Sequence, residues 1–344
     1  MDRKLILSVT GSGKTKLLID RLDEERRFLI VTYTDKNSDN IKRRTLRKFG
    51  YIPKNVTIYT FFEFLLAVCY RPFFSYKVKA KGIDWKMPDT KTRYYKRTNK
   101  AFYINTYHRI YHNRISLLCN TIADEIKNRI EKYYDCFYYD EAQDLNGHDF
   151  NLILRIIPES IETLIVGDFF QHTFSTSTDG NTNHGLYDDI LKYKNKWLAA
   201  NYKIDETTLI KSHRCSPVIC DFVRTKIGID IYSANNNNSV IKEINDSKEA
   251  EILIQNNHIP KLFLKDAHKY TCYTLNWGES KGLDDFEDVC VVLNKTTLDY
   301  FYSNRLYSLP SLTKNKLYVA CTRASRNIYF LPFTFLEKYK KGII

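Results

Sequence analysis

Gly11-Ser12-Gly13-Lys14-Thr15 is the segment whose residue types most clearly indicate chemistry. It follows a short apolar run at 5–10 and opens an amphipathic run that reaches about residue 27. In a phosphate-binding loop, glycines allow backbone N–H groups to close around phosphate oxygens. Lys14 would then contact the β- and γ-phosphates, and Thr15 would bind Mg²⁺. The expected cradle residues are Ser8, Gly11, Ser12 and Gly13, with Ser8 standing where the usual pattern has glycine.

A carboxylate at the end of a buried strand must accompany such a loop, and Asp140-Glu141 is the candidate. The pair follows the apolar run 136–139 and precedes Gln143 and Asp144. Asp140 would hold Mg²⁺ through water, and Glu141 would orient or deprotonate the attacking water. An acidic pair alone is usually a solvated surface feature. The strand before this pair favours the metal-binding interpretation.

The elements around these motifs indicate an α/β protein. Strand-like runs at 5–10, 28–34, 56–60 and 163–167 alternate with helical stretches. This alternation predicts a parallel sheet with crossover helices. A second α/β region begins near residue 205 and carries strand-like runs at 289–293 and 328–332. With 344 residues, the chain has room for two domains.

Asp140–Asp144, together with the loop, resembles motif II of the UvrD/Rep-like helicases of superfamily 1. Other motifs of that family follow in order along the chain. They are Val31–Lys36 (motif Ia), Thr57–Phe62 (the Thr-x-His-Ser-Phe element), Gly167–Gln171 (motif III), Ser212–Cys215 (motif IV), Ser280–Asp284 (motif V) and Leu317–Ala324 (motif VI). Each string is weak alone, and their shared order is what carries the resemblance.

The resemblance implies two RecA-like P-loop NTPase domains with parallel sheets, at 1–203 and 204–344. It implies a small basic helical insertion at about 63–116 in the first domain, and ATP with Mg²⁺ in the cleft between the domains. The large second accessory domain of the family has no counterpart, so a compact form is expected. An adenine-reading glutamine has no counterpart in the residues before Ser8, and the preference for ATP therefore rests on the resemblance.

The resemblance also assigns roles to single residues. Gln171 is expected to sense the γ-phosphate, and either Asp284 or the next residue, Asp285, to contact the ribose. Arg214 and Arg323 match the family's two arginines that stabilise charge on the γ-phosphoryl oxygens during transfer. The residues expected to contact single-stranded DNA are Thr32, Thr34, Lys36, Thr57, Tyr59, Phe174 and Lys281.

The distribution of charge points to a polyanionic partner independently. The chain has 53 Lys and Arg against 40 Asp and Glu, a net charge of +13. Residues 71–117 hold twelve Lys and Arg, ten aromatic residues and only two acids, Asp84 and Asp89. Basic side chains neutralise phosphates while rings stack on bases. The alternative is a helical hairpin with tyrosines packed beneath a solvated basic face.

These observations predict an ATP-dependent translocase or helicase, a DNA-dependent ATPase that acts on single-stranded or tailed duplex DNA. The resemblance to the UvrD branch implies that it moves 3′→5′. One alternative is a nucleotide-gated DNA-binding or sensor subunit that acts with a nuclease in defence or repair. Another is a P-loop kinase or GTPase-like switch, which leaves Arg323 unexplained. The sequence lacks a long apolar run, a signal peptide and any CxxC pair among its eight cysteines. We therefore expect a cytoplasmic protein without disulfides, zinc or membrane contact.

Overall fold

A computed structural model describes residues 2–174, 182–283 and 286–341. By its internal contacts the chain forms two compact units. The first comprises residues 2–6, Thr15–Gly167 and residues 182–205, and the second comprises Leu7–Lys14, Asp168–Phe174 and the described residues from Glu206 onward. Both are α/β units with parallel sheets, as RecA-like domains are. The predicted boundary between 203 and 204 stays a prediction.

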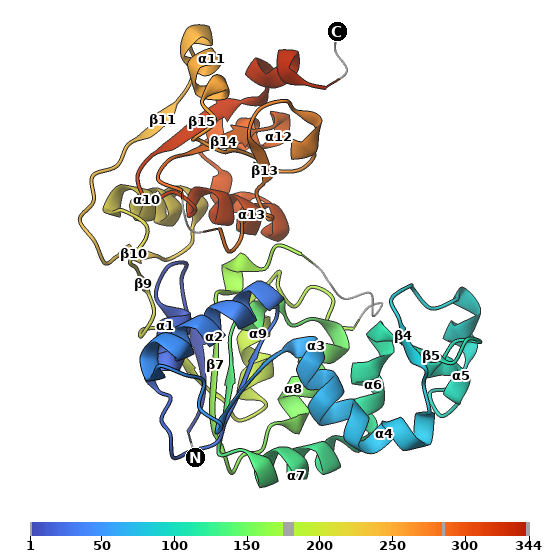
Figure 1. Ribbon diagram of the computed structural model, residues 1–344. Coiled ribbons are helices and arrows are strands. Elements are labelled where there is room, and N and C mark those ends of the chain that lie inside the picture. Colours follow the sequence, from blue (N-terminus) through green and yellow to red (C-terminus); the bar gives the residue numbers. More distant parts are fainter. Residues whose placement is uncertain (1, 175–181, 284–285, 342–344) are drawn as a thin grey trace. The chain divides into compact units, whose positions relative to one another are not determined.

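A six-stranded sheet in the order β3-β2-β6-β7-β1-β8 forms the centre of the first unit (Figure 1). The pairs β3–β2, β2–β6, β6–β7 and β1–β8 are parallel. Both β2 and β6 are buried along their whole length, which explains their continuous apolar sequences. The strands are β1 (Arg3–Leu7), β2 (Phe28–Thr32), β3 (Val56–Thr60), β6 (Cys136–Tyr139), β7 (Glu162–Gly167) and β8 (Lys203–Asp205).

The helices of the first unit connect these strands. The longest, α2 (Asp35–Phe49), begins at the N-cap Thr34 and ends at Gly50, whose φ of 80° suits a residue without a side chain. Helix α3 (Phe61–Phe64) runs through the π-helical segment Leu65–Tyr70 into α4 (Arg71–Val78). The remaining helices are α1 (Lys14–Asp20), α6 (Ile115–Cys119), α7 (Ala123–Tyr133), α8 (Gly147–Ile156) and α9 (Ile190–Leu198).

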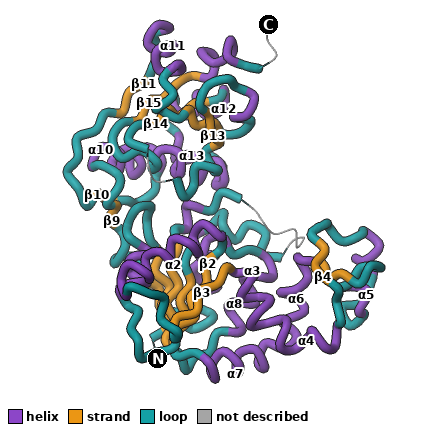
Figure 2. The backbone as a smooth tube through the Cα atoms, in the orientation of Figure 1, coloured by secondary structure: helices purple, strands orange, loops and turns teal. Residues whose placement is uncertain are grey.

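The insertion after β3 forms a lobe to which α4 and α6 lead (Figures 1 and 2). Besides short helical turns and α5 (Lys100–Tyr103), it contains two parallel strands, β4 (Gly82–Asp84) and β5 (Arg109–Tyr111). The sequence predicts only helices here, because strands of three residues show no periodicity. Arg114 holds the lobe together from inside, with its guanidinium 3.9 Å from the Phe102 ring centroid. One of the twelve basic residues is therefore structural.

The second unit contains a five-stranded parallel sheet in the order β11-β15-β14-β12-β13. Alternate residues of β14 enter two different cores, Val289 and Val291 on one face and Cys290 and Val292 on the other. The strands predicted at 289–293 and 328–332 are confirmed as β14 and β15. The strands are β11 (Ile241–Glu243), β12 (Lys261–Phe263), β13 (Thr274–Asn276), β14 (Val289–Leu293) and β15 (Ile328–Pro332).

Four helices accompany this sheet, together with a small parallel pair of strands. The helices are α10 (Pro217–Phe222), α11 (Ser247–Gln255), α12 (Lys295–Tyr302) and α13 (Ser311–Cys321), and the pair is β9 (Lys211–Ser212) with β10 (Tyr232–Ser233). All eight cysteines are free thiols. Within the described residues, no helix combines the length and apolar character that crossing a membrane requires.

Gly167, the last residue of β7, allows a close approach that a side chain would block. A Cβ atom there would lie 2.8 Å from Gln143 Oε1 and 3.1 Å from the Ala142 nitrogen. We expect Gly167→Ala to lower the free energy of unfolding by about 1–3 kcal/mol, measured by urea denaturation. The control is Gly82→Ala, where the nearest atom is 3.5 Å away at the flexible end of Arg109. Equal stability of the two variants would contradict this packing.

Candidate active site

Thr15 and Asp140 lie together in the first unit. The Thr15 hydroxyl donates a hydrogen bond to Asp140 Oδ2 at 2.9 Å. Asp140 directly follows β6, is only 1% exposed, and its backbone N–H donates to Val31 O. The Asp140 carboxylate, at the end of the fully buried strand β6, thus lies beside Thr15. The structure brings together the two residues predicted to bind Mg²⁺.

Glu141 has a backbone conformation that is uncommon for a residue with a side chain, with φ 62° and ψ 47°. Such left-handed residues cost roughly 1 kcal/mol or more and often mark functional positions. The Glu141 N–H donates to Asp140 Oδ1 at 3.0 Å, and the buried Gln143 donates to the Glu141 carboxylate. These contacts hold the Glu141 backbone against the Asp140 carboxylate and the Glu141 carboxylate against Gln143.

The phosphate loop belongs by its contacts to the second unit. Gly11 and Gly13 have φ values of 64° and 91°, which residues with side chains rarely adopt. A Cβ atom on Gly11 would also lie 2.8 Å from the Arg214 Cβ. The Ser12 hydroxyl donates to Val9 O at 2.7 Å and tightens the turn. Ser8, Ser12 and Lys14 are all buried.

Arg214 and Arg323 both reach this loop at one atom. Arg214 Nη1 and Arg323 Nη2 donate to the Thr10 hydroxyl oxygen at 3.1 and 3.0 Å. Arg323 is only 2% exposed and also donates to Val319 O and Leu283 O. Two guanidinium groups therefore converge beside the glycines of the loop. This concentration of positive charge suits an anion.

Tyr318 and Asp168 join the same site, although the sequence analysis gives them no role. The Tyr318 hydroxyl accepts a hydrogen bond from the Thr10 backbone N–H at 3.0 Å and donates one to Asp168 Oδ2 at 2.8 Å. Burial, with the Asp168 carboxylate, raises the pKa of Tyr318 well above its ordinary value, so the hydroxyl keeps its proton. The residues joined by these two hydrogen bonds are 150 and 308 positions apart in the sequence. Such contacts leave no local signal in a sequence.

Three further predicted site residues lie in the second unit. Gln171 is buried in the turn Phe169–Gln171, which Asp168 caps by accepting from Phe170 N–H. Phe174 is half exposed, lies 3.0 Å from the position of a Gly278 Cβ, and has the Lys316 ammonium 5.9 Å from its ring centroid. Lys281 is partly buried. Asp284, the predicted ribose contact, lies outside the described residues.

The predicted DNA contacts of the first unit differ in burial and in their place along the strands and α2. Thr32 is fully buried in β2, and the Thr34 hydroxyl accepts from Asn37 N–H as the cap of α2. Lys36 is exposed in the first turn of that helix. Tyr59 and Thr57 are partly buried in β3, where they pair with Val31 and Leu29. Thr57 thus lies three residues before the strand end that Thr60 and Thr32 share.

Thr15 and Asp140 supply the kind of donors that Mg²⁺ prefers. A hydroxyl and a carboxylate oxygen 2.9 Å apart are hard oxygen ligands, and Mg²⁺ usually takes one or two of these with phosphate oxygens and water. In the part of the chain that the structure describes, no group of three or more His, Cys, Asp or Glu side chains is arranged to hold a metal ion. The residues present therefore fit a nucleotide-associated Mg²⁺.

No protein-family model and no curated protein sequence matches this chain. Its fold is similar to that of solved helicases. The complex of arterivirus nonstructural protein 10 (helicase) with DNA gives a TM-score of 0.52 at 13% identity, over 97% of this chain and 63% of that one. This likeness shows the fold. The chain spans less than two thirds of the length of that protein.

Two related structures have lower scores. Arterivirus nonstructural protein 10 (helicase) alone gives a TM-score of 0.48 at 13% identity, over 97% of this chain and 62% of that one. The PRRSV helicase gives 0.47 at 14% identity, over 96% and 52%. The two-domain RecA-like fold class predicted from the sequence is confirmed. The UvrD/Rep-like branch is not distinguished by these likenesses.

The hydrogen bonds of Tyr318 give a stability prediction. We expect Tyr318→Phe to lower the free energy of unfolding by about 1–3 kcal/mol, because it takes a donor from a buried carboxylate and an acceptor from a buried N–H. Denaturant titration followed by circular dichroism would measure this. Tyr139→Phe is the matched control, since the buried Tyr139 hydroxyl has no partner among the described residues. A loss in the control as large as that in Tyr318→Phe would refute the role given to the Tyr318 hydroxyl.

Proposed function

We propose that this protein hydrolyses a nucleoside triphosphate, ATP by resemblance, and uses the reaction to move along nucleic acid. The observation that carries the proposal is the convergence of Arg214 and Arg323 on Thr10 of the phosphate loop. Phosphoryl transfer needs arginines that stabilise the charge on the γ-phosphoryl oxygens, and two late motifs supply them at this loop. A turn that only binds phosphate does not need them. The Thr15–Asp140 pair supports the same reading.

The residues would divide the chemistry as follows. The backbone of the glycine-rich loop and Lys14 would bind the phosphates, and Thr15 with Asp140 would hold Mg²⁺, which neutralises charge on the phosphate oxygens when bound. Glu141 would orient the attacking water and accept its proton. The guanidinium groups of Arg214 and Arg323 would stabilise charge on the transferring phosphoryl group. Gln171, near Asp168 in the chain, would sense whether the γ-phosphate is present.

DNA is the proposed track, with movement 3′→5′ as in the UvrD/Rep-like branch that the motifs resemble. The DNA complex of the similar arterivirus helicase and the basic, aromatic stretch 71–117 support nucleic acid in general. Single-stranded or tailed duplex DNA would be the substrate of a helicase. The proposal includes a cytoplasmic location and a role in repair or antiviral defence, in which a nuclease would be the protein partner.

The catalytic assignment of Glu141 is testable by removing its charge. We expect Glu141→Gln to retain nucleotide–Mg²⁺ binding while turnover falls below about a tenth of the wild-type value, because a neutral amide cannot take a proton from water. Phosphate release with and without single-stranded DNA would measure turnover. Glu125→Gln, at an exposed position in the first turn of α7, is the control. Near-normal turnover in Glu141→Gln would remove Glu141 from the mechanism.

The direction of movement is testable with tailed duplexes. If the motif resemblance extends to polarity, strand separation should require a 3′ single-stranded tail, and a 5′-tailed or blunt duplex should remain paired. A fluorophore–quencher pair at the duplex end would follow unwinding. Preference for the 5′ tail would overturn the polarity. Stimulated hydrolysis without any unwinding would favour a translocase, and hydrolysis unaffected by DNA would favour the nucleotide-gated sensor.

A further inference from the structure

Trp85 is an exposed tryptophan in a chain that buries its others. Its side chain is 63% exposed, whereas Trp197 and Trp277 are 0% exposed. Leaving a large aromatic ring in water forgoes a substantial hydrophobic gain. The position of Trp85 in the lobe therefore needs a reason.

The strand pairing of the lobe fixes Trp85 beside His112. Strands β4 and β5 pair in register up to Asp84 and Tyr111, and Trp85 and His112 are the next residues of each. Their rings stack, with centroids 5.5 Å apart and planes 27° apart. A ring nitrogen of His112, Nδ1, lies 3.2 Å from the Asp84 carbonyl oxygen, which holds the imidazole in place.

Phe62 holds the indole from the main body of the first unit. The Trp85 and Phe62 ring centroids are 4.8 Å apart. Phe62 lies in the first turn of α3, where Thr60 and Glu63 form a capping box that fixes the helix start. The indole is therefore held by two rings, and its 63% exposure leaves it too open to be covered on both faces.

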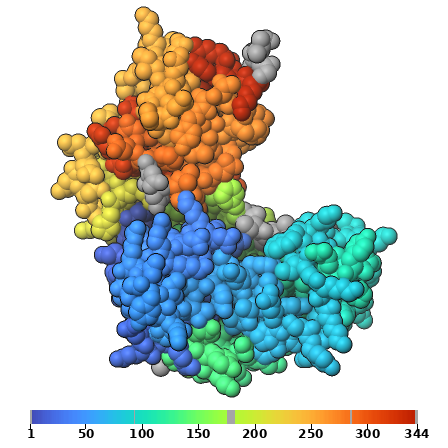
Figure 3. All heavy atoms as spheres, viewed as in Figure 1, coloured from blue at the N-terminus to red at the C-terminus, as the bar shows by residue number. Residues whose placement is uncertain are grey.

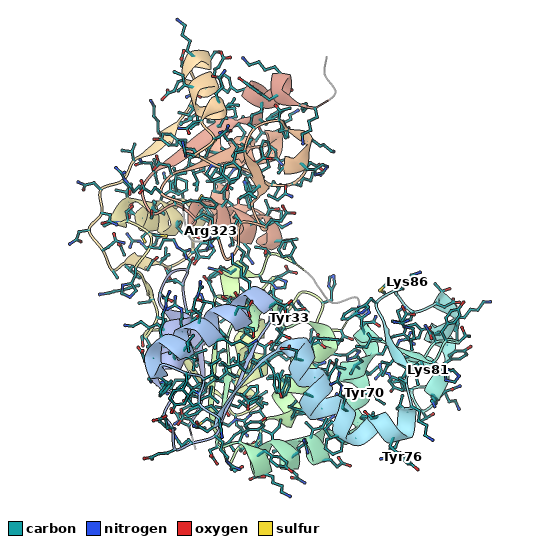
Figure 4. The ribbon with its side chains drawn as sticks, in the orientation of Figure 1. Tyr33, Tyr70, Tyr76, Lys81, Lys86 and Arg323 are labelled. Atoms are coloured by element: carbon teal, nitrogen blue, oxygen red, sulfur yellow. The ribbon has the colours of Figure 1, made fainter. Side chains whose placement is uncertain are left out.

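Two lysines flank β4, the strand that leads to Trp85. Lys81 precedes this strand and Lys86 follows Trp85, and both lie on the lobe that stands out in the space-filling view (Figures 3 and 4). Neither lysine has an ion-pair partner among the described residues. The nearby Asp84 carboxylate accepts from Lys86 N–H and Asn105 Nδ2, and the first of these bonds lowers the pKa of Asp84. The two acids of the lobe serve its own turns, since Asp89 likewise accepts from Lys91 N–H.

We propose that Trp85 is a base-stacking site for single-stranded nucleic acid. An unpaired base would stack on the open part of the indole while the flanking phosphates lie near Lys81 and Lys86. A ring already held by Phe62 and His112 loses little conformational freedom on binding, which favours affinity. The identification of the ligand as nucleic acid rests on the proposed function. The Trp85 site adds a nucleic-acid contact that none of the sequence motifs predicts.

The tryptophan distribution makes this site directly observable. Because the other two tryptophans are buried, a base on Trp85 should quench the exposed part of the emission of the whole protein. We expect oligo(dT) and oligo(U) to quench this emission, and an abasic oligomer with the same number of phosphates to bind at low salt without quenching it. Trp85→Phe should abolish the quenching. Two results would overturn the site: quenching that persists in Trp85→Phe, or quenching by the abasic oligomer that is as strong as quenching by oligo(dT).

Affinity measurements separate the ring from its charge. Trp85→Ala should weaken oligo(dT) binding by roughly 5- to 150-fold, the value of one base stack, and leave the slope of log K against log salt unchanged. Trp85→Phe should retain most of the affinity. Tyr107→Ala is the matched control, because it removes an exposed ring for which the described residues provide no ring contact. An equal loss in the control would indicate a general aromatic surface and refute a specific site.

Two further outcomes distinguish this proposal from the proposed function. Quenching by oligo(dT) without stimulation of hydrolysis would support the Trp85 site and contradict the translocase. Stimulation of hydrolysis by oligo(dT) without quenching of Trp85 would support the translocase and contradict the Trp85 site. A poly-glutamate peptide that quenches Trp85 and competes with oligo(dT) would show that the lobe binds an acidic protein partner, and would overturn the nucleic-acid site.

Discussion

Asp168 is a fully buried carboxylate at the end of a buried strand, and a charge in that position costs several kcal/mol unless donors reach it. The Tyr318 hydroxyl is one donor, and the same hydroxyl accepts the Thr10 N–H. Satisfying the carboxylate therefore fixes α13, which ends two residues before Arg323, and the loop that begins the phosphate site. The Thr10 hydroxyl oxygen in turn accepts hydrogen bonds from both Arg214 and Arg323. The conformation of the loop and the placement of the guanidinium groups follow from one buried polar network.

The sequence predicts the parts of the site that depend on neighbours in the chain. The glycines of the loop, the buried strand before Asp140 and the parallel strands all have local signatures, because backbone conformation and burial constrain residue type at each position. The Thr10–Tyr318–Asp168 network has none, since each residue would also suit an ordinary strand end or helix. The position of Thr57, three residues before the strand end, also depends on register. The motif string alone does not reveal it.

The basic insertion has features of both structures that its sequence allows, a packed hairpin and a nucleic-acid-binding surface. Tyr103 and Tyr111 are buried, and Arg114 stacks on Phe102 inside the lobe, as a packed hairpin would require. Tyr76, Tyr94 and Tyr107 are exposed, and the Lys79 ammonium lies 5.3 Å from the Tyr76 ring centroid, as a nucleic-acid surface would require. Composition counts residues without regard to which face they occupy. In a segment whose strands have three residues each, periodicity cannot supply that information.

The π-helical segment Leu65–Tyr70 lies between α3, which carries Phe62, and α4, which leads into the lobe. A π-helical turn accommodates an extra residue within an otherwise regular helix. Each residue of an α-helix turns the chain by about 100°, so deleting one residue here would rotate everything that α4 carries by roughly that angle. Trp85 would then no longer face Phe62. The length of this helix, as well as the residues in it, is therefore under constraint, and insertions or deletions within 65–70 should be far less tolerated during evolution than substitutions at the same positions.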